Sequence, residues 1–278
     1  MANVSAADVK RLRDATGAGM MDCKKALTEA GGDYDQAVEL LRLKGAKDVG
    51  KRESRTAANG LVTAVLDGTG KGVLLELACE TDFVAKTPAF QDLAADVAGT
   101  VLSTNPADVE TLLGTTAKGG QTVREQIDAA NATMGEKIEA RRFADFTGGY
   151  VATYLHKSSP DLPPTVGVLV QLDKQDEQIA KDVAQQIAAM SPQFVTRDEV
   201  PAETVANERR IAEQMARDEG KPEQAISKIV EGRVGAYFKD YVLVEQASVK
   251  ENKKTIKALL DEAGVTVQRF ARFKVGQQ

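Results

Sequence analysis

One sequence pattern occurs twice along this chain of 278 residues, and the repetition limits the folds that the chain can adopt. The run GVLLEL, which starts at Gly72, is matched by GVLVQL, which starts at Gly167. LAADVA, which starts at Leu93, is matched by IAKDVA, which starts at Ile179. A repeat this long is unlike the short periods of solenoid arrays. We therefore predict two related α+β subdomains, each made of a hairpin and a following helix.

Both copies carry hairpin signals ahead of the helix. In the first copy LVTAVL, from Leu61, is joined to GVLLELA by DGTGKG, a turn rich in Asp-Gly and glycine. In the second copy YVATYLH, from Tyr150, is joined to GVLVQL by the longer, proline-rich KSSPDLPP. The sequence thus predicts antiparallel sheets in both subdomains.

The copies differ in length between strand and helix. The first spans 27 positions from the glycine of its strand motif to the last alanine of its helix motif, and the second spans 18, so the first is nine residues longer. The excess falls around ETDFVAKTP, residues 80–88. Because the second copy closes without these residues, and because loops on rigid scaffolds often carry function, we expect a functional segment here. The alternative is that Phe83 packs back onto its own subdomain, since phenylalanine is usually buried.

Three short helices are expected in residues 5–45. Ser5 can cap the first helix, Asp22 is expected to open the second, and Asp33 can cap the third. Glycines follow each helix, as they do at many helix ends. The core of such a small bundle is expected to be marginal.

The remaining segments complete the prediction. Residues 107–139 are expected to be mainly helical, and RRFADF, residues 141–146, can supply another strand. Residues 201–241 form two helices broken at Gly220-Lys-Pro222, which is typical of an antiparallel helical hairpin. Thr255 begins a helix, and VTVQRFARFKV after it alternates as a strand that completes the second sheet.

Composition and charge exclude several classes of protein. The net charge of −5 and pI near 5.2 argue against broad nucleic-acid binding, which needs basic charge to neutralise phosphates. The sequence contains no run of about 18 consecutive apolar residues, so no membrane span is expected. Two cysteines without a metal or redox spacing fit free thiols in a reducing cytosol. We expect a soluble, cytoplasmic protein without a targeting leader.

The sequence carries little catalytic chemistry. His156 is the only histidine, and no motif supports pairing it with Cys79 as a nucleophilic site. No phosphate-binding glycine motif is present, and no carboxylates stand at a metal-ligand spacing. These observations favour a binding protein over an enzyme, and one without a cofactor of its own.

Three segments carry a family resemblance. TGAGMMDCKKAL (residues 16–27), TDFVAK (residues 81–86) and YLH…GVLV (residues 154–170) resemble the bacterial elongation factor Ts family. Members of that family are guanine-nucleotide exchange factors for elongation factor Tu and support translation elongation. The resemblance covers nearly the whole chain in order, including EGRV at Glu231 and the terminal RFKVG.

The resemblance implies a specific arrangement of the α+β fold. It consists of a UBA-like three-helix domain, a core of two related subdomains and an inserted antiparallel coiled-coil hairpin. The implied segments are 1–55 for the UBA-like domain and its linker, 56–147 for the core N-subdomain, 148–200 for the first part of the core C-subdomain, 201–241 for the helical hairpin, and 242–278 for the completion of the C-subdomain.

The resemblance also implies where elongation factor Tu is contacted. The implied contact residues are Met20, Met21 and Lys24 in the N-terminal domain, Thr81, Asp82, Phe83 and Val84 in the first core subdomain, Met134 and Gly135 after it, and His156 in the second. Thr81 to Val84 is the segment associated with dislocation of Mg²⁺. The implied protein acts on the Mg²⁺ and GDP of its partner and holds neither itself.

Several alternatives stay open at the level of sequence. One of the two methionines could belong to the bundle core, Lys24 could be an ordinary solvated charge, and His156 could bond within its own subdomain. Many family members continue into a further C-terminal helical module, which is not expected after Gln278. A homodimer or a 2:2 complex through the core or the helical hairpin is left open.

Two other classes of function compete with nucleotide exchange. In the first, the three-helix module is an adaptor for a ubiquitin-like or ribosome-associated protein, and the core only oligomerises. The nine extra residues argue against it, because an adaptor needs no insertion there. In the second, Cys79 is an enzymatic nucleophile.

Overall fold

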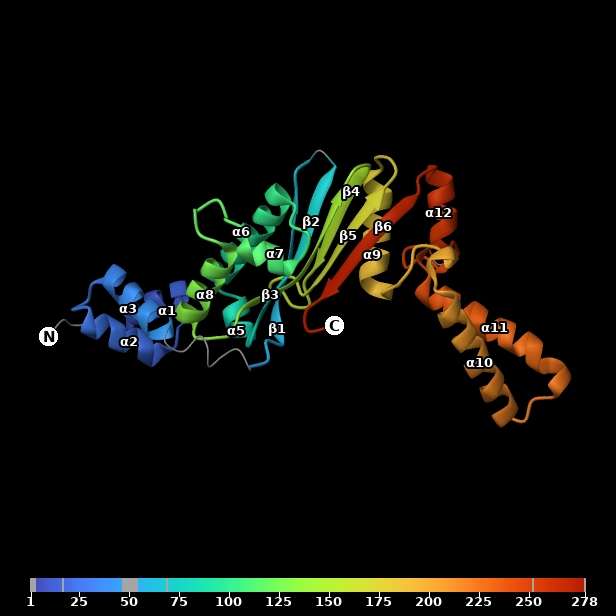
Figure 1. Ribbon diagram of the computed structural model, residues 1–278, viewed down its shortest axis with the longest axis horizontal. Coiled ribbons are helices and arrows are strands. Elements are labelled where there is room, and N and C mark those ends of the chain that lie inside the picture. The colour runs from blue at the N-terminus through green and yellow to red at the C-terminus, as the bar shows by residue number, and fades with distance from the viewer. Residues whose placement is uncertain (1–3, 17, 47–54, 69, 252, 278) are drawn as a thin grey trace. The chain divides into compact units, whose positions relative to one another are not determined.

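The computed structural model describes residues 4–16, 18–46, 55–68, 70–251 and 253–277. Helices are mixed with two three-stranded antiparallel sheets, of order β1-β2-β3 and β4-β5-β6, which confirms the predicted α+β class (Figure 1). The chain divides into two compact units. The first comprises Met1–Thr147, Leu155–Leu169 and Phe273–Gln278, and the second comprises Gly148–Tyr154 and Val170–Arg272.

Three helices, blue in Figure 1, open the first unit: α1 (Ala6–Thr16), α2 (Met20–Glu29) and α3 (Tyr34–Ala46). The Ser5 hydroxyl accepts a hydrogen bond from the N–H of Asp8 at 3.1 Å, and the Asp33 carboxylate caps α3, so both of these predicted caps are confirmed. The predicted start of the second helix at Asp22 is wrong. α2 begins at Met20. Its N-cap residue is Gly19, which has no side chain that could form a capping hydrogen bond.

These helices share a small apolar core that does not stand alone. Its fully buried members include Leu12, Cys23 and Ala37. α3 also packs against α8 (Val123–Met134) of the same unit. The marginal bundle is therefore supported by a second element of the unit to which it belongs.

The first sheet contains the predicted hairpin. β1 (Asn59–Leu66) and β2 (Lys71–Cys79) are antiparallel, with Leu61 opposite Leu77. Gly68 and Gly70 adopt positive φ angles of 77° and 94° in the connecting turn, which glycine tolerates without steric penalty. β3 (Glu139–Thr147) lies antiparallel on the other side of β2, so the predicted strand at residues 141–146 is also confirmed.

Helices α6 (Pro88–Thr104), α7 (Val109–Gly114) and α8 bury one face of this sheet. The Thr87 hydroxyl accepts a hydrogen bond from the N–H of Phe90 at 3.3 Å, and Pro88 takes the first helical position, a combination that is typical of helix starts. Side chains that are fully buried in this core are Val73, Leu75, Leu77, Cys79, Phe90, Ala94, Val97, Ala98, Val101, Leu112 and Val123.

The second sheet and its helix repeat the first at equivalent positions. The sheet consists of β4 (Tyr150–His156), β5 (Val166–Leu172) and β6 (Val267–Lys274), and α9 (Glu177–Met190) follows β5. The buried residues Ala180, Val183, Ala184 and Ile187 of α9 stand 86 positions after the buried residues Ala94, Val97, Ala98 and Val101 of α6. The internal repeat is thus expressed as a repeated burial pattern.

The nine extra residues of the first copy are distributed over three places. β2 runs two residues beyond the point equivalent to the end of β5, and α6 starts three residues earlier than α9. The other four residues lengthen the connection, which is residues 80–87 in the first copy and residues 173–176 in the second. Less than half of the excess is therefore loop, and the longer connection holds a short helix of its own, α5 (Asp82–Ala85).

The second unit contains the predicted helical hairpin, made of α10 (Ala202–Asp218) and α11 (Glu223–Tyr241). The two helices pack along each other through buried side chains. Those with less than a tenth of their surface exposed are Ala212, Ala216, Ile226, Val230, Val234 and Phe238. An ion pair of 2.7 Å between Arg233 and Glu219 adds a link between α11 and the end of α10. Short 3₁₀ turns, η1 (Arg197–Glu199) and η2 (Leu243–Glu245), flank the hairpin, and α12 (Ile256–Ala263) precedes β6.

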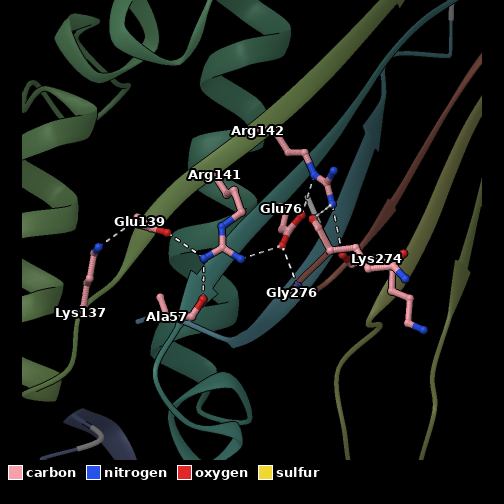
Figure 2. A network of polar contacts seen from close by, with 9 residues as sticks. Ala57, Glu76, Lys137, Glu139, Arg141, Arg142, Lys274 and Gly276 are labelled. Carbon is pink, nitrogen blue, oxygen red and sulfur yellow. Dashed lines mark hydrogen bonds and ion pairs between the residues drawn. The ribbon is translucent and has the colours of Figure 1, made fainter. Parts of the chain in front are cut away.

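The buried acid Glu76 links β2 to β3 and to the C-terminal residues of the first unit (Figure 2). Glu76 of β2 is fully buried, yet its carboxylate accepts hydrogen bonds from Arg142 at 2.7 Å, from Arg141 at 3.5 Å and from the backbone N–H of Gly276 at 3.2 Å. Arg142 also donates to the carbonyl of Gln277 at 2.8 Å. The desolvated charge is paired and hydrogen-bonded, as such groups must be.

The five predicted segment boundaries, from 1–55 to 242–278, stay predictions. The linker expected at residues 47–55 falls mostly on residues 47–54, which lie outside the described residues.

Candidate functional site

The connection between β2 and α6 is built around the short helix α5. Thr81 is its N-cap, with extended backbone angles, and the Thr81 hydroxyl accepts a hydrogen bond from the N–H of Val84 at 3.4 Å. The N–H of Lys86 donates to the carbonyl of Asp82 at 3.2 Å and closes the turn. A capped single turn can fix the direction in which each of its four side chains points.

Helix α5 separates its side chains into a buried pair and an exposed pair. Val84 and Ala85 are 3% and 1% exposed and belong to the core under the first sheet. Phe83 is 70% exposed, and Asp82 is partly exposed. The alternative that Phe83 packs back onto its own subdomain is therefore wrong. A large aromatic side chain held in solvent on a structured turn is accessible to a partner, and aromatic side chains are frequent among the residues that dominate binding energy.

A cation accompanies the exposed pair. The Lys86 ammonium lies 3.0 Å from the Asp82 carboxylate and 5.8 Å from the centre of the Phe83 ring. Both charged side chains are more than a third exposed, so the ion pair contributes little to stability. A shallow cleft beside them is lined by Arg13 and Asp14 of α1 and by Phe83, Lys86, Thr87 and Pro88.

Two carboxylates anchor the strand end that precedes α5. Glu136 accepts hydrogen bonds from the N–H groups of Glu80 at 3.1 Å and Thr81 at 3.0 Å, and from the Thr81 hydroxyl at 2.5 Å. Glu80 in turn accepts a bond from the N–H of Lys137 at 2.6 Å. Burial of the carboxyl, together with the nearby charge of Glu80, raises the pKa of Glu136.

The candidates on α2 are all at the surface. Met20 and Met21 are 56% and 63% exposed, so neither belongs to the core of the bundle. Lys24 is exposed as well. The buried face of α2 is formed instead by Cys23, Ala26 and Leu27. Two adjacent exposed methionines present a soft apolar surface that can adapt to a partner.

The candidates after α8 differ from each other. Met134 is buried in the core of the first sheet, on the same helical face as Val123 and Ile127. Its side chain therefore presents almost no surface in this structure. Gly135 is exposed and ends α8 with a φ angle of 78°, a conformation that favours glycine. His156 is exposed at the end of β4, where its carbonyl accepts a hydrogen bond from the N–H of Thr165 at 3.1 Å.

Comparison with known proteins decides the family. A family model described as Elongation factor TS matches residues 80–277. The chain belongs to the elongation factor Ts family. Elongation factor Ts of Thermobifida fusca is 63% identical over the full length of both chains, that of Mycobacterium marinum is 57% identical over the same extent, and that of Streptomyces griseus is 56% identical over 99% of this chain and all of the relative.

Membership of the elongation factor Ts family makes the chain a translation elongation factor. The matched region begins at Glu80 and so contains α5 and both carboxylates that anchor it. The three N-terminal helices precede the region matched by the family model but lie within the aligned length of the relatives.

Cys79 does not offer the nucleophile that an enzyme would need. It is fully buried at the end of β2, and burial raises the pKa of its thiol to about 12. Its sulfur lies 3.1 Å from the carbonyl of Thr81. Because the thiolate and not the thiol is reactive, Cys79 is inert near neutral pH.

The described residues hold neither a cluster of metal ligands nor a membrane-spanning helix. Among residues 4–16, 18–46, 55–68, 70–251 and 253–277, no three His, Cys, Asp or Glu side chains gather as metal ligands. In the same part of the chain, no helix is both long and apolar enough to cross a membrane.

Glu80 lies in the expected functional segment, residues 80–88, but neither Glu80 nor Glu136 was among the predicted contact residues. Glu136 directly follows the predicted contact Met134-Gly135, but its hydrogen-bond partners stand 55 and 56 positions away. No short motif can carry such a contact. The signal in the sequence is that Glu80 directly precedes and Glu136 directly follows a predicted contact residue.

Proposed function

We propose that this protein is a guanine-nucleotide exchange factor that binds elongation factor Tu carrying GDP and promotes release of the GDP. The observation that carries the proposal is the 70% exposure of Phe83 on a capped turn, in a chain of the elongation factor Ts family. In this proposal the protein makes and breaks no bonds and requires no metal or cofactor of its own.

The proposed target is the Mg²⁺ that helps to hold the nucleotide. GTPases bind the phosphates of GDP through backbone amides, a lysine and Mg²⁺. Mg²⁺ demands nearly ideal octahedral geometry, so a small shift of the groups that support it weakens its binding sharply. Phe83 inserts into an apolar seam of the partner, and Asp82 disturbs the polar network around the ion.

The energetic demand shows that Phe83 does not act alone. Burial of a phenylalanine side chain contributes about 1.5–3 kcal/mol. Release that is a thousandfold faster requires the barrier to fall by about 4 kcal/mol. The exposed surface of α2, with Met20, Met21 and Lys24, is proposed to supply further binding energy, and Gly135 and His156 are proposed as lesser contacts.

The coupling between factor and nucleotide must be reciprocal. If the factor weakens binding of GDP to its partner, then GDP weakens binding of the factor by the same ratio. The complex with nucleotide-free elongation factor Tu is therefore expected to be the tight one, and excess GDP should dissociate it.

The test is release of a fluorescent GDP from purified elongation factor Tu. Wild-type protein is expected to accelerate release in proportion to its concentration until saturation. Titration of GDP into the nucleotide-free complex should then separate the two proteins. If wild-type protein leaves the release rate unchanged, the proposal is wrong, and the adaptor function becomes the leading alternative.

A further inference from the structure

The position of Phe83 depends on groups outside its own helix. α5 has only four residues, far fewer than an isolated helix needs for stability in water. Val84 and Ala85 anchor one face of the turn in the core. The start of the turn must be fixed by other contacts if Phe83 is to point in one direction.

Glu136, which directly follows the C-cap residue Gly135 of α8, supplies these contacts. One carboxylate oxygen accepts hydrogen bonds from two consecutive N–H groups, those of Glu80 and Thr81, at 3.1 and 3.0 Å. The other oxygen accepts the Thr81 hydroxyl at 2.5 Å. Hydrogen bonds to an ionised acceptor are about twice as strong as neutral ones, so this side chain holds the strand end firmly.

The Thr81 hydroxyl passes this restraint to α5. A hydroxyl has one proton to donate and lone pairs to accept with. Its proton is directed to Glu136, which leaves a lone pair directed to the N–H of Val84. The cap of α5 and the contact to Glu136 therefore depend on the same oxygen atom, one residue away from Asp82 and two from Phe83.

A second set of hydrogen bonds joins the same two segments, but here the carboxylate belongs to residue 80 and the backbone donor to residue 137. The Glu80 carboxylate accepts the N–H of Lys137 at 2.6 Å and lies 3.3 Å from the Arg55 guanidinium. The Asn59 amide donates to the carbonyl of Glu80 at 2.7 Å. Residues 80–81 and 136–137 thus hold each other through both acids, and β1 supports the junction.

We propose that Glu136 is a positioning residue that orients Phe83 for nucleotide exchange by fixing Thr81 and the cap of α5. The inference rests on the proposed function and extends it to a residue that is not among the predicted contacts. The three hydrogen bonds use both carboxylate oxygens as acceptors, so an acid fits this position better than an amide. Burial disfavours the ionised carboxyl of Glu136, and a glutamine would avoid that penalty but could accept on only one of its two terminal atoms.

The first test follows backbone hydrogen exchange of residues 81–87 in the free protein, by mass spectrometry. Glu136→Ala is expected to speed exchange of these amides about tenfold, and Glu136→Gln to give an intermediate value. Glu125→Ala is the matched control, because Glu125 accepts the N–H of Thr122 at 2.8 Å at the other end of α8. If Glu136→Ala and Glu125→Ala give equal protection at 81–87, the proposal is wrong.

The second test is a double-mutant cycle on the rate of GDP release at saturating factor. Glu136→Ala is expected to slow release about tenfold in the wild-type background and less than about twofold in the Phe83→Ala background, because it acts through Phe83. An equal loss in both backgrounds would show that Glu136 acts independently of Phe83 and would overturn the proposal.

The two tests separate the inference from the function on which it rests. If wild-type protein does not accelerate release of GDP from elongation factor Tu, the nucleotide-exchange function fails. Hydrogen exchange alone then decides whether Glu136 fixes α5. If wild-type protein accelerates GDP release but the amides of residues 81–87 are equally protected from hydrogen exchange without Glu136, the nucleotide-exchange function stands and the positioning role fails.

Discussion

Phe83 and Val84 are neighbours in the chain, yet Phe83 is 70% exposed and Val84 is 3% exposed. The four-residue helix α5 produces this division, because Val84 and Ala85 point into the core and Phe83 points away from it. The core thus anchors the turn that carries Phe83 through Val84 and Ala85, while the Phe83 ring stays exposed.

Substitutions at these two neighbours should separate stability from exchange. Val84→Ala removes two buried methyl groups and leaves a small cavity, so we expect it to lower the free energy of unfolding by about 2 kcal/mol. Phe83→Ala removes an exposed ring and should change it by less than about 0.5 kcal/mol. Urea denaturation measures both values. A similar loss of stability in Phe83→Ala would show that the ring packs on the protein in solution.

The buried acid of β2 should dominate the electrostatic contribution to stability. Glu76→Ala leaves Arg141 and Arg142 without their buried partner, and we expect a loss of about 3–5 kcal/mol in the free energy of unfolding. Glu110→Ala is the matched control, since it breaks an exposed pair with Arg124 and should change stability by about 0–1 kcal/mol. Equal effects of the two substitutions in urea denaturation would contradict the role assigned to Glu76.

Cys79 should make stability fall at alkaline pH. Its thiol pKa is raised to about 12 in the folded protein from an ordinary value of 9.0, so the unfolded chain releases the proton first. The stabilising contribution is complete below pH 9 and is lost as pH rises from about 9 towards 12. Compared with Cys79→Ala, wild-type protein should therefore lose more stability between pH 8 and about 10.5. Identical pH profiles would show that the folded thiol titrates normally.

The burial of Cys79 also predicts slow chemical modification. A thiol-specific reagent should label Cys79 in native protein only at the rate of local unfolding, and rapidly in denaturant. Rapid labelling of the native protein near neutral pH would contradict the inert thiol described above.

The exposed methionines of α2 should contribute to binding of elongation factor Tu. Met21→Ala is expected to raise the concentration of factor that gives half-maximal GDP release about tenfold, because it removes an apolar contact from the partner interface. Leu43→Ala is the control, since Leu43 of α3 is also exposed, at 59%, and is not a predicted contact. Equal values for the two variants would remove α2 from the proposed interface.

Much of the fold could be predicted because local patterns agreed with one another. The DGTGKG turn and the repeated motifs both predict elements that the structure contains. The start of α2 failed because its N-cap is Gly19, which has no side chain by which a cap could be recognised.

Side-chain exposure at the candidate site was harder to predict. Phe83 and Val84 are both apolar, and only the direction of the turn sends one into the core and the other into solvent. Met134 could have been recognised as buried, because it follows Val123 and Ile127 at helical spacing. The roles of Glu76 and Glu136 could not have been recognised from the sequence, because their partners lie on segments that come together only in the fold.

The central claim is that exposed Phe83 drives release of GDP from elongation factor Tu. Its most direct test compares the release rate at saturating factor for Phe83→Ala and for Leu66→Ala, which removes another exposed apolar side chain from the same unit. The account predicts that Phe83→Ala slows release at least about tenfold, with unchanged unfolding, while Leu66→Ala keeps the wild-type rate. Equal rates for wild type and both variants would contradict it.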